Sequence, residues 1–321
     1  MPVGIANIGN TCFLNAALQC IMALPRLCEQ LRLKLMIRTL PLAPARGGGV
    51  GVMLRSVCGL LEQQAAREED HRALDASAIK AALAPIFPGS RQQDAHEALT
   101  RLIEALHSDC GRRAREINEV NEVNEVNDDL AVRWWRQSEA RDSSIVSDEL
   151  RGQLESEVAC VACGHLSRSF EAFWELLVSP SGHSRLEACV GAFFAREHLG
   201  HDYRCDGCGR RGTCARRMSV RRAPAVLVVC LKRFCGSSMR KLEDAVLLPE
   251  RTSLGGRSYA LRAVVDHVGS LSGGHYTTRR RDHERWVRCN DSHVAPCASP
   301  CEVPEASAYI LVYAAVDVII H

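Results

Sequence analysis

Residues 9–15, which read Gly-Asn-Thr-Cys-Phe-Leu-Asn, contain a cysteine in a position that suits nucleophilic chemistry. Cys12 follows Asn10 and Thr11, two residue types that commonly cap helices. A thiol at a helix N-terminus lies at the positive end of the helix dipole, which favours the nucleophilic thiolate. The alternative is a buried structural cysteine. A helix that ends before Pro25 is predicted from apolar residues at helical spacing: Leu14, Leu18 and Ile21.

A cysteine nucleophile needs a base, usually a histidine, and a third group that orients the imidazole. Among the 12 histidines, His275 follows the flexible pair Gly273-Gly274 and begins a predicted strand, so it can be held firmly beside a substrate. The alternative is an ordinary surface histidine. A second predicted strand ends in Asn290 and Asp291, and a hairpin with a short loop around Arg281 would bring both residues to His275.

Two CxxC pairs in the second half of the chain have the spacing of metal ligands. With 16 cysteines about one such pair is expected by chance, but a glycine follows each pair and suits a tight knuckle. We therefore predict a four-coordinate structural zinc site. Its expected ligands are Cys160, Cys163, Cys205 and Cys208, and nearby alternatives are Cys214, His165 and His201.

Helices in the first half and strands in the second must position these groups, a pattern that predicts an α+β domain with a mainly antiparallel sheet. The clearest helix is predicted over about residues 91–107, with Ser90 and Gln93 as a capping box. Asp75 is predicted to cap a shorter helix that runs through Leu83. Strands are predicted at residues 170–178, 225–231, 259–265 and 309–313.

Composition is ordinary for a soluble globular protein, with 46% hydrophobic and 24% charged residues among 321. The net charge of +2 argues against a nucleic-acid binder. The start of the chain lacks the features of a secretory signal, and no apolar run approaches the roughly 20 residues that span a bilayer. We expect a cytosolic or nuclear protein whose cysteines are not disulfide-bonded. The Asn-Glu-Val triplets at residues 118–126 indicate an exposed, low-complexity insertion over about residues 116–128.

Several motifs, taken in order along the chain, resemble the conserved blocks of the ubiquitin-specific protease family. Residues 4–15 resemble that family's cysteine box, and residues 266–276 with 286–294 resemble its histidine box. The similarity covers residues 4 to about 314, and several motifs in the correct order are more specific than any one of them. Further matches lie at residues 92–97, 144–146, 152–154 and 231–234.

This resemblance implies a papain-like cysteine protease fold with thumb, palm and fingers. A single catalytic domain would span residues 1–321, with the thumb at about 1–140, the fingers at about 150–220 and the palm at about 221–315. A zinc ribbon at residues 160–208 would form the tip of the fingers. The implied activity is cleavage of the (iso)peptide bond after the C-terminal Gly of ubiquitin. The implied partners are ubiquitin and ubiquitinated proteins, without nucleic acid or membrane, and the expected state is a monomer.

The same resemblance implies a role for each residue of the site. Cys12 matches the nucleophile, His275 the general base and Asn290 the orienting residue, with Asp291 beside it as an alternative orienting group. Asn7 matches the side chain that stabilises the oxyanion.

Three further residues are expected to bind the substrate. Gln92 and Asp94 match residues that hold ubiquitin's extended, basic tail, and Tyr276 is also expected to bind the substrate. Gln92 and Asp94 also fall in the first turn of a predicted helix, where their alternative role is capping.

The chain departs from the family pattern near His275. Thr-Thr-Arg-Arg-Arg at residues 277–281 replaces an apolar, aromatic strand. Cys289 replaces an aromatic residue, and Asp266 stands where Asn is more usual. We interpret the three arginines as a solvated strand end, with a basic patch for an acidic partner as the alternative.

Two other functions remain open. A non-catalytic ubiquitin-binding protein would result if the altered strand distorted the site, although Cys12, His275, Asn290 and Asn7 are all present. A nucleic-acid-binding zinc ribbon is a second alternative, which the small net charge disfavours. It would use the arginines around the ribbon: Arg210, Arg211, Arg216, Arg217, Arg221 and Arg222.

Overall fold

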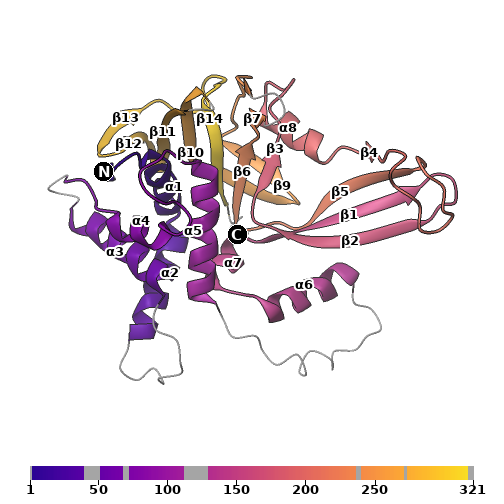
Figure 1. Cartoon of the computed structure of the whole chain (residues 1–321), viewed down its shortest axis with the longest axis horizontal. Helices are drawn as coiled ribbons and strands as arrows, with labels where there is room; N and C mark the ends of the chain where they lie inside the picture. The colour runs from indigo at the N-terminus through magenta and orange to yellow at the C-terminus, as the bar shows by residue number, and fades with distance from the viewer. Residues whose placement is uncertain are drawn as a thin grey trace, which may run out of the picture.

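The computed structural model describes residues 2–39, 51–67, 72–111, 129–235, 240–270 and 273–316. Helices gather on one side of a central sheet, and a long arm of strands extends from the other side (Figure 1). The predicted low-complexity insertion lies outside the described residues.

Helix α1 (Cys12–Met22) is the centre of the helical layer, and each of its residues is buried. It packs against helix α5 (Ala95–Cys110) and against strands β10 (Arg257–Ser270) and β11 (Gly273–Asp282) of the sheet. The cysteine box is therefore rigidly seated between helices and sheet. The other helices of this layer are α2 (Pro25–Thr39), α3 (Val52–Ala66), α4 (Ser77–Leu83) and α7 (Ile145–Leu150).

The central sheet has the strand order β13-β12-β11-β10-β14-β6-β3, and β9 pairs with β10. All its pairs are antiparallel except β3 with β6. Helices α1 and α5 cover one face, while α8 (Leu186–Phe193) packs near β3 at the far edge. The remaining strands are β3 (Leu176–Val178), β6 (Val226–Leu231), β9 (Arg251–Leu254), β12 (Arg285–Asn290), β13 (His293–Cys297) and β14 (Ala308–Ala315).

The arm is a four-stranded antiparallel sheet in the order β2-β1-β5-β4 (Figure 1). Helix α6 (Leu130–Arg141) lies along its base, where Gln153 Nε2 donates to the backbone carbonyl of Ala131 at 2.8 Å. The Trp135 ring contacts the guanidinium groups of Arg151 and Arg222 at 5.0 and 4.7 Å. These cation–π contacts fix α6 to the arm. The strands are β1 (Gly152–Cys160), β2 (Leu166–Phe173), β4 (Glu197–His198) and β5 (Cys214–Arg222).

The α+β class, the antiparallel sheet and most of the predicted elements are confirmed. Strands β6, β10 and β14 cover three of the predicted strand segments. The predicted hairpin also forms, since β11 pairs with β12 from Thr278↔Cys289 to Asp282↔Arg285. Its turn lies at His283 and Glu284, two residues beyond the predicted centre.

The prediction of one strand at residues 170–178 is wrong, because the segment divides between two sheets. Strand β2 ends at Phe173 in the arm, and β3 starts at Leu176 in the central sheet. Between them, Glu175 Oε2 lies 2.6 Å from His96 Nε2 on α5, so side-chain contacts with the helical layer interrupt the alternating pattern.

The predicted start of α5 is also wrong. The helix begins at Ala95, and its N-cap is Asp94, whose carboxylate accepts from the backbone N–H groups of His96 and Glu97. Gln92 therefore precedes the helix, and Ser90 with Gln93 forms no capping box. The charged carboxylate of Asp94 is the better acceptor at the positive end of the helix. At α4 the predicted cap is one residue off: Asp75 accepts from Ser77 N–H, but the cap position is Ala76.

The prediction of a solvated arginine strand after Tyr276 is wrong, and so is the basic-patch alternative, because Arg279 and Arg280 are each only 3% exposed. Arg279 makes a two-bonded ion pair with Asp266, at 2.8 and 2.7 Å, and also bonds Glu305. Arg280 lies on the opposite face of β11, where its guanidinium donates to Gln64 Oε1 at 3.3 Å. The strand behind His275 is thus held by buried polar contacts in place of aromatic packing.

Candidate active site

Cys12 is the first residue of α1, and a sharply turned backbone leads into it. Gly9 and Asn10 have positive φ angles of 100° and 53°, a conformation that glycine and asparagine tolerate best. Thr11 occupies the N-cap position, but its side chain makes no capping hydrogen bond. Its hydroxyl accepts from the Ile8 N–H instead. The first N–H groups of the helix remain available to the sulfur.

The Cys12 thiol lies against the strand that carries His275. The backbone N–H groups of Tyr276, the residue after His275, and of Phe13 and Cys12 itself are near enough to the sulfur to lower its pKa. Burial raises the pKa of the Cys12 thiol, and the negative charge of Asp291 raises it further, while the three N–H groups lower it. The raising effects dominate, so the helix N-terminus alone does not make Cys12 a thiolate in this structure.

His275 is hydrogen-bonded to Asn290 across the β11–β12 hairpin. The distance between His275 Nε2 and Asn290 Oδ1 is 2.6 Å. With the amide oxygen accepting, the ring carries its proton on Nε2, which leaves Nδ1 free to act as a base. His275 lies near the start of β11 and Asn290 is the last residue of β12, so the hairpin places the two side chains at the same end of these strands.

Asp291 bonds to a different set of groups. Its residue has a positive φ of 50°, and its carboxylate accepts from Asn7 Nδ2 at 2.9 Å and from Asn15 Nδ2 at 2.8 Å. Its backbone carbonyl accepts from Ile5 N–H at 2.8 Å. The structure thus pairs Asn290 with His275, whereas Asp291 ties the cysteine box to the histidine box.

Asn7 is held by hydrogen bonds at both ends of its amide. Its Nδ2 donates to Asp291, and its Oδ1 accepts from the backbone N–H groups of Gly9 and Thr11 at 3.2 and 3.1 Å. An amide nitrogen carries two hydrogens, so one remains for another acceptor. Asn15 also belongs to this network, through Asp291, and the sequence motif predicted no role for it. Its position one helical turn after Thr11 was the available signal.

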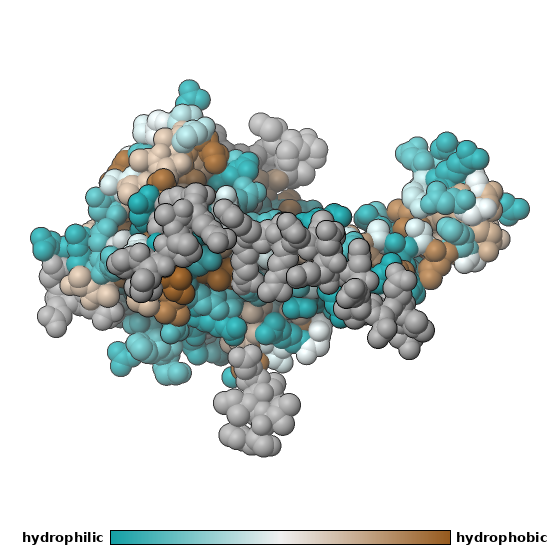
Figure 2. All heavy atoms as spheres, turned by 90° about the horizontal axis from the view of Figure 1, so that it is seen from below, coloured by the Kyte–Doolittle hydropathy of each residue, from teal (hydrophilic) through white to brown (hydrophobic). Residues whose placement is uncertain are grey.

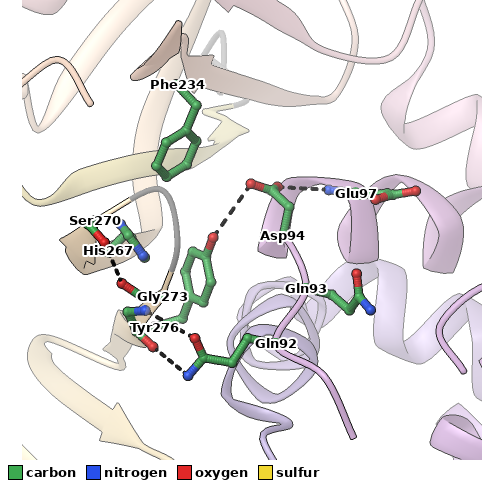
Figure 3. Close-up of a pocket in the computed structure, with 10 residues that line it drawn as sticks. Gln92, Gln93, Asp94, Glu97, Phe234, His267, Ser270, Gly273 and Tyr276 are labelled. Carbon is green, nitrogen blue, oxygen red and sulfur yellow. Dashed lines mark hydrogen bonds between the residues drawn. The ribbon is translucent and has the colours of Figure 1, made fainter. Parts of the chain in front are cut away.

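A pocket of about 350 Å³ opens between the start of α5 and the sheet (Figure 3). It brings together all three expected substrate-binding residues, Gln92, Asp94 and Tyr276, together with Phe234 and His267. Gln92 reaches across it, with Nε2 donating to the Gly274 carbonyl at 2.9 Å and Oε1 accepting from the Gly274 N–H at 3.1 Å.

The carboxylate of Asp94 is committed to the protein's own groups. Besides capping α5, it accepts from the Tyr309 hydroxyl at 3.0 and 2.9 Å and from the Tyr276 hydroxyl at 3.5 Å. Capping and positioning are thus the contacts that the structure gives Asp94, and Tyr309 is a pocket-shaping residue that sequence analysis missed. Glu97, also on the pocket wall, has a more exposed carboxylate.

His267 forms the inner wall of the pocket beside Tyr276, with ring centroids 4.6 Å apart. Burial, together with the charge of Lys241, lowers the pKa of His267 to about 4. The ring is therefore neutral at pH 7 and contributes surface, not charge, to the pocket.

The four predicted metal ligands meet at the far end of the arm, where their sulfur atoms all lie within 4.8 Å of one another. Cys160 and Cys208 sulfurs are 3.9 Å apart, and those of Cys163 and Cys205 are 3.7 Å apart. Four thiolates around a tetrahedral zinc, with bonds of about 2.3 Å, would be about 3.8 Å apart, so the cluster fits that ion.

The two knuckles that carry these cysteines have the same backbone form. Gly164 and Gly209 have φ angles of 73° and 72°, and the N–H of each donates to the backbone carbonyl of the first cysteine of its pair. Glycine is favoured at such angles, as the sequence pattern predicted. The alternatives Cys214, His165 and His201 are not members of this cluster of described residues.

A helix bearing the thiol, packed on an antiparallel sheet bearing the histidine, is the papain-like cysteine protease architecture. The family model "Ubiquitin carboxyl-terminal hydrolase" matches residues 3–313. The chain therefore belongs to the ubiquitin carboxyl-terminal hydrolase family. Within that family it is a catalytic domain of the ubiquitin-specific protease type.

Curated relatives agree with this assignment. Ubiquitin carboxyl-terminal hydrolase 2 of Bos taurus is 32% identical over 334 residues, which cover 97% of this chain and 54% of the relative. Ubiquitin carboxyl-terminal hydrolase 21 of Homo sapiens is 31% identical over 350 residues, covering 97% and 61%. Usp2 of Drosophila melanogaster is 30% identical, covering 97% and 34%. The chain thus spans between a third and three fifths of the length of these relatives.

Solved structures show the same fold. A Ubp8 variant in the SAGA DUB module bound to monoubiquitin superposes with a TM-score of 0.76 at 22% identity, over 98% of this chain and 69% of that one. The Ubp8 module bound to ubiquitin aldehyde gives a TM-score of 0.74 at 20% identity, over 98% and 70%. The predicted papain-like fold is confirmed.

Proposed function

We propose that this chain is a deubiquitinating thiol hydrolase that cleaves the (iso)peptide bond after the C-terminal Gly of ubiquitin. The observation that carries the proposal is the packing of helix α1, which begins at Cys12, against strand β11, which carries His275. Asn290 holds His275 at 2.6 Å. Ubiquitin as the substrate is supported by the family, and by the Ubp8 structures that contain it.

In the proposed reaction, His275 accepts the thiol proton and the Cys12 sulfur attacks the carbonyl carbon of ubiquitin's terminal glycine. His275 then gives the proton to the leaving lysine amine, the C–N bond breaks, and a thioester remains on Cys12. Water, deprotonated by His275, attacks the thioester and releases the ubiquitin carboxylate. Because burial raises the pKa of Cys12, the sulfur depends on His275 to accept its proton before it can attack.

The negative oxygen that forms during the attack needs hydrogen-bond donors. Asn7 supplies the Nδ2 hydrogen that Asp291 does not use, and the N–H groups at the start of α1 lie beside the sulfur. Removing one such donor typically costs about 2.7 to 4 kcal/mol of transition-state stabilisation. Asp291 thus serves catalysis by holding Asn7, not by orienting His275.

The pocket between α5 and the sheet receives ubiquitin's tail in this proposal. Gln92 and Tyr276 line it, and the carboxylates of Asp94 and Glu97 make it attractive to a basic peptide. Asp94 acts mainly by fixing Tyr276 and Tyr309, since its oxygens are already bonded to protein groups.

Zinc has a structural role in this proposal. Cys160, Cys163, Cys205 and Cys208 would hold one ion and complete its coordination, which leaves no position for a reacting group. The ion would tie the knuckle after β1 to the knuckle before β5 at the end of the arm. We further propose a monomer that works in the cytosol or nucleus, where its free thiols persist.

The proposal is tested with ubiquitin that carries a thiol-reactive C-terminal electrophile. The wild-type chain is expected to form one covalent adduct, and Cys12→Ala none, as measured by intact mass. A wild-type chain that forms no adduct contradicts the enzyme assignment. An adduct that persists in Cys12→Ala contradicts the choice of nucleophile.

A second function, a ubiquitin-binding protein of the same fold with impaired catalysis, is favoured by one observation. The buried Cys12 thiol, with its raised pKa, is poorly nucleophilic in the free protein. In the same experiment, that function predicts that the chain binds unmodified ubiquitin but leaves the electrophile unreacted.

A further inference from the structure

The Gln92 side chain crosses the pocket and occupies both backbone groups of one residue (Figure 3). Gln92 belongs to the helical layer, two positions before the Asp94 N-cap, whereas Gly274 belongs to strand β11 and directly precedes His275. A single carboxamide therefore connects the two walls of the pocket one residue away from the proposed base.

Gly274 lies on a part of β11 whose outer edge has no neighbouring strand among the described residues. Strand β12 pairs with β11 only from Thr278↔Cys289 onward, while Gly274 pairs with Gly269 of β10 on the inner edge. An open strand edge is where an extended peptide can add by backbone hydrogen bonds. One N–H and one C=O of the same residue, both bonded outward, form the pattern of an antiparallel pair.

The space beside Gly274 on the β10 side is filled. A Cβ on Gly274 would lie 2.2 Å from His267 Nε2 and 2.6 Å from the Val268 carbonyl oxygen, so only glycine fits there. The N–H and C=O of Gly274 both bond to the Gln92 side chain, so a peptide that pairs with these two groups must take the place of that side chain.

We propose that the Gln92 carboxamide is a displaceable strap that imitates a substrate backbone and closes the tail pocket until ubiquitin's extended C-terminal segment replaces it at Gly274. This inference rests on the proposed function. The two hydrogen bonds are solvent-exposed, so their net strength is small and a peptide that offers the same donor and acceptor can replace them. The fraction of molecules with the strap open limits the apparent affinity for the tail.

The test compares ubiquitin binding to Gln92→Ala and to its matched control Gln93→Ala, both in a Cys12→Ala background that prevents turnover. Gln93 lines the same pocket but has no hydrogen bond to Gly274 among those described. Calorimetry is expected to give a Kd for ubiquitin about three- to tenfold lower for Gln92→Ala, which corresponds to the loss of one or two exposed hydrogen bonds. Ubiquitin without its C-terminal tail should bind all three proteins equally.

An unchanged or higher Kd in Gln92→Ala would overturn the strap, because it would make Gln92 either inert or simply a contact for the substrate. A tighter Kd that also appears with tail-less ubiquitin would overturn it as well, since the effect would then not arise at Gly274.

A measurement without ubiquitin separates this inference from the proposed function. Amide hydrogen exchange at Gly274 in the free protein is expected to be faster in Gln92→Ala than in the wild type, and unchanged in Gln93→Ala. Equal exchange in all three proteins would overturn the strap, even if ubiquitin binds. If ubiquitin fails to bind any of them, the proposed function fails, while the exchange rates still decide whether the strap exists.

Discussion

At the scale of single side chains, the adjacent residues Asn290 and Asp291 have different partners in the site. Asn290 bonds to His275, and the positive φ of Asp291 directs its carboxylate to Asn7 and Asn15. The sequence motif indicated Asn290 as the orienting residue but left its neighbour Asp291 as an alternative. Their separate roles depend on a backbone angle and on partners more than 270 positions away, which no local pattern contains.

Replacing Asn290 by alanine should lower kcat/KM on a ubiquitin-derived fluorogenic substrate by about tenfold to a hundredfold. The imidazole would lose the acceptor that fixes its tautomer and orientation, and with it part of the 10²–10⁴-fold typical of general acid–base catalysis. Asn290→Asp, which keeps an acceptor oxygen, should retain most activity. Equal losses in the two variants would argue against an orienting role.

The Cys12 thiol in the free protein should react with a small neutral alkylating reagent mainly at alkaline pH, because burial and Asp291 raise its pKa above the usual value of 9.0. Asp291→Asn removes a negative charge that disfavours the thiolate, so the midpoint of the pH–rate profile should move to lower pH. Glu97→Gln, which removes a charge on the far wall of the pocket, is the control and should leave it in place. A midpoint that stays unchanged in Asp291→Asn would contradict this account of the thiol.

At the scale of secondary structure, strand β11 is held against β10 by a buried ion pair. The residues after Tyr276 depart from the family pattern, as does Asp266, and the structure joins the two departures in one ion pair. Arg279 lies diagonally across from Asp266, whose direct partner is Thr277. The pair therefore holds the register of β10 and β11, and a shift of one residue would turn His275 to the other face.

Apolar residues at helical spacing or in continuous runs predicted α1, β6 and β14, which are buried over all or most of their length. Such patterns failed where long-range contacts decide the outcome. Arginine at three successive positions reads as solvent-exposed, yet two of these residues are buried because Asp266, Glu305 and Gln64 are supplied by distant segments. The break between β2 and β3 has the same origin, in the contact of Glu175 with His96.

Arg279→Met should destabilise the domain by about 3–5 kcal/mol in urea unfolding, because it leaves Asp266 buried without its partner. The double variant Arg279→Met with Asp266→Asn should recover part of that loss. Arg281→Met is the matched control: its ion pair with the exposed Glu250 should contribute about 0–1 kcal/mol. Additive losses in the double variant would show that the two residues do not act as a pair.

At the scale of the whole molecule, the helical layer and the central sheet hold the candidate catalytic residues, and the arm carries the cysteine cluster far from them (Figure 1). Figure 2 shows this separation from below, with the end of the arm projecting away from the main body. The ligand spacing was readable from the sequence because CxxC–Gly knuckles are local structures. The meeting of α5 and β11 at the tail pocket was not readable from residue spacing, since the two are far apart in the chain, and only the family resemblance grouped their residues.

Elemental analysis of the purified chain should find one zinc per molecule, and Cys205→Ser should lose it, because three remaining ligands hold the ion weakly. Cys214→Ser, a change of a nearby cysteine outside the cluster, should retain the metal. Cys205→Ser should also weaken cleavage of ubiquitin substrates while the alkylation rate of Cys12 stays within about twofold, since the cluster lies far from the thiol. Full zinc content in Cys205→Ser would contradict the assignment of ligands.

The central claim, that Cys12 and His275 together make this fold a hydrolase of ubiquitin conjugates, is tested most directly on isopeptide-linked diubiquitin. Cleavage to monoubiquitin should be followed for the wild type, Cys12→Ala and His275→Ala, with acid-quenched intact mass to detect ubiquitin joined to the chain as a thioester. The account predicts cleavage and a thioester in the wild type only. No cleavage by the folded wild type, or undiminished cleavage by His275→Ala, would contradict it.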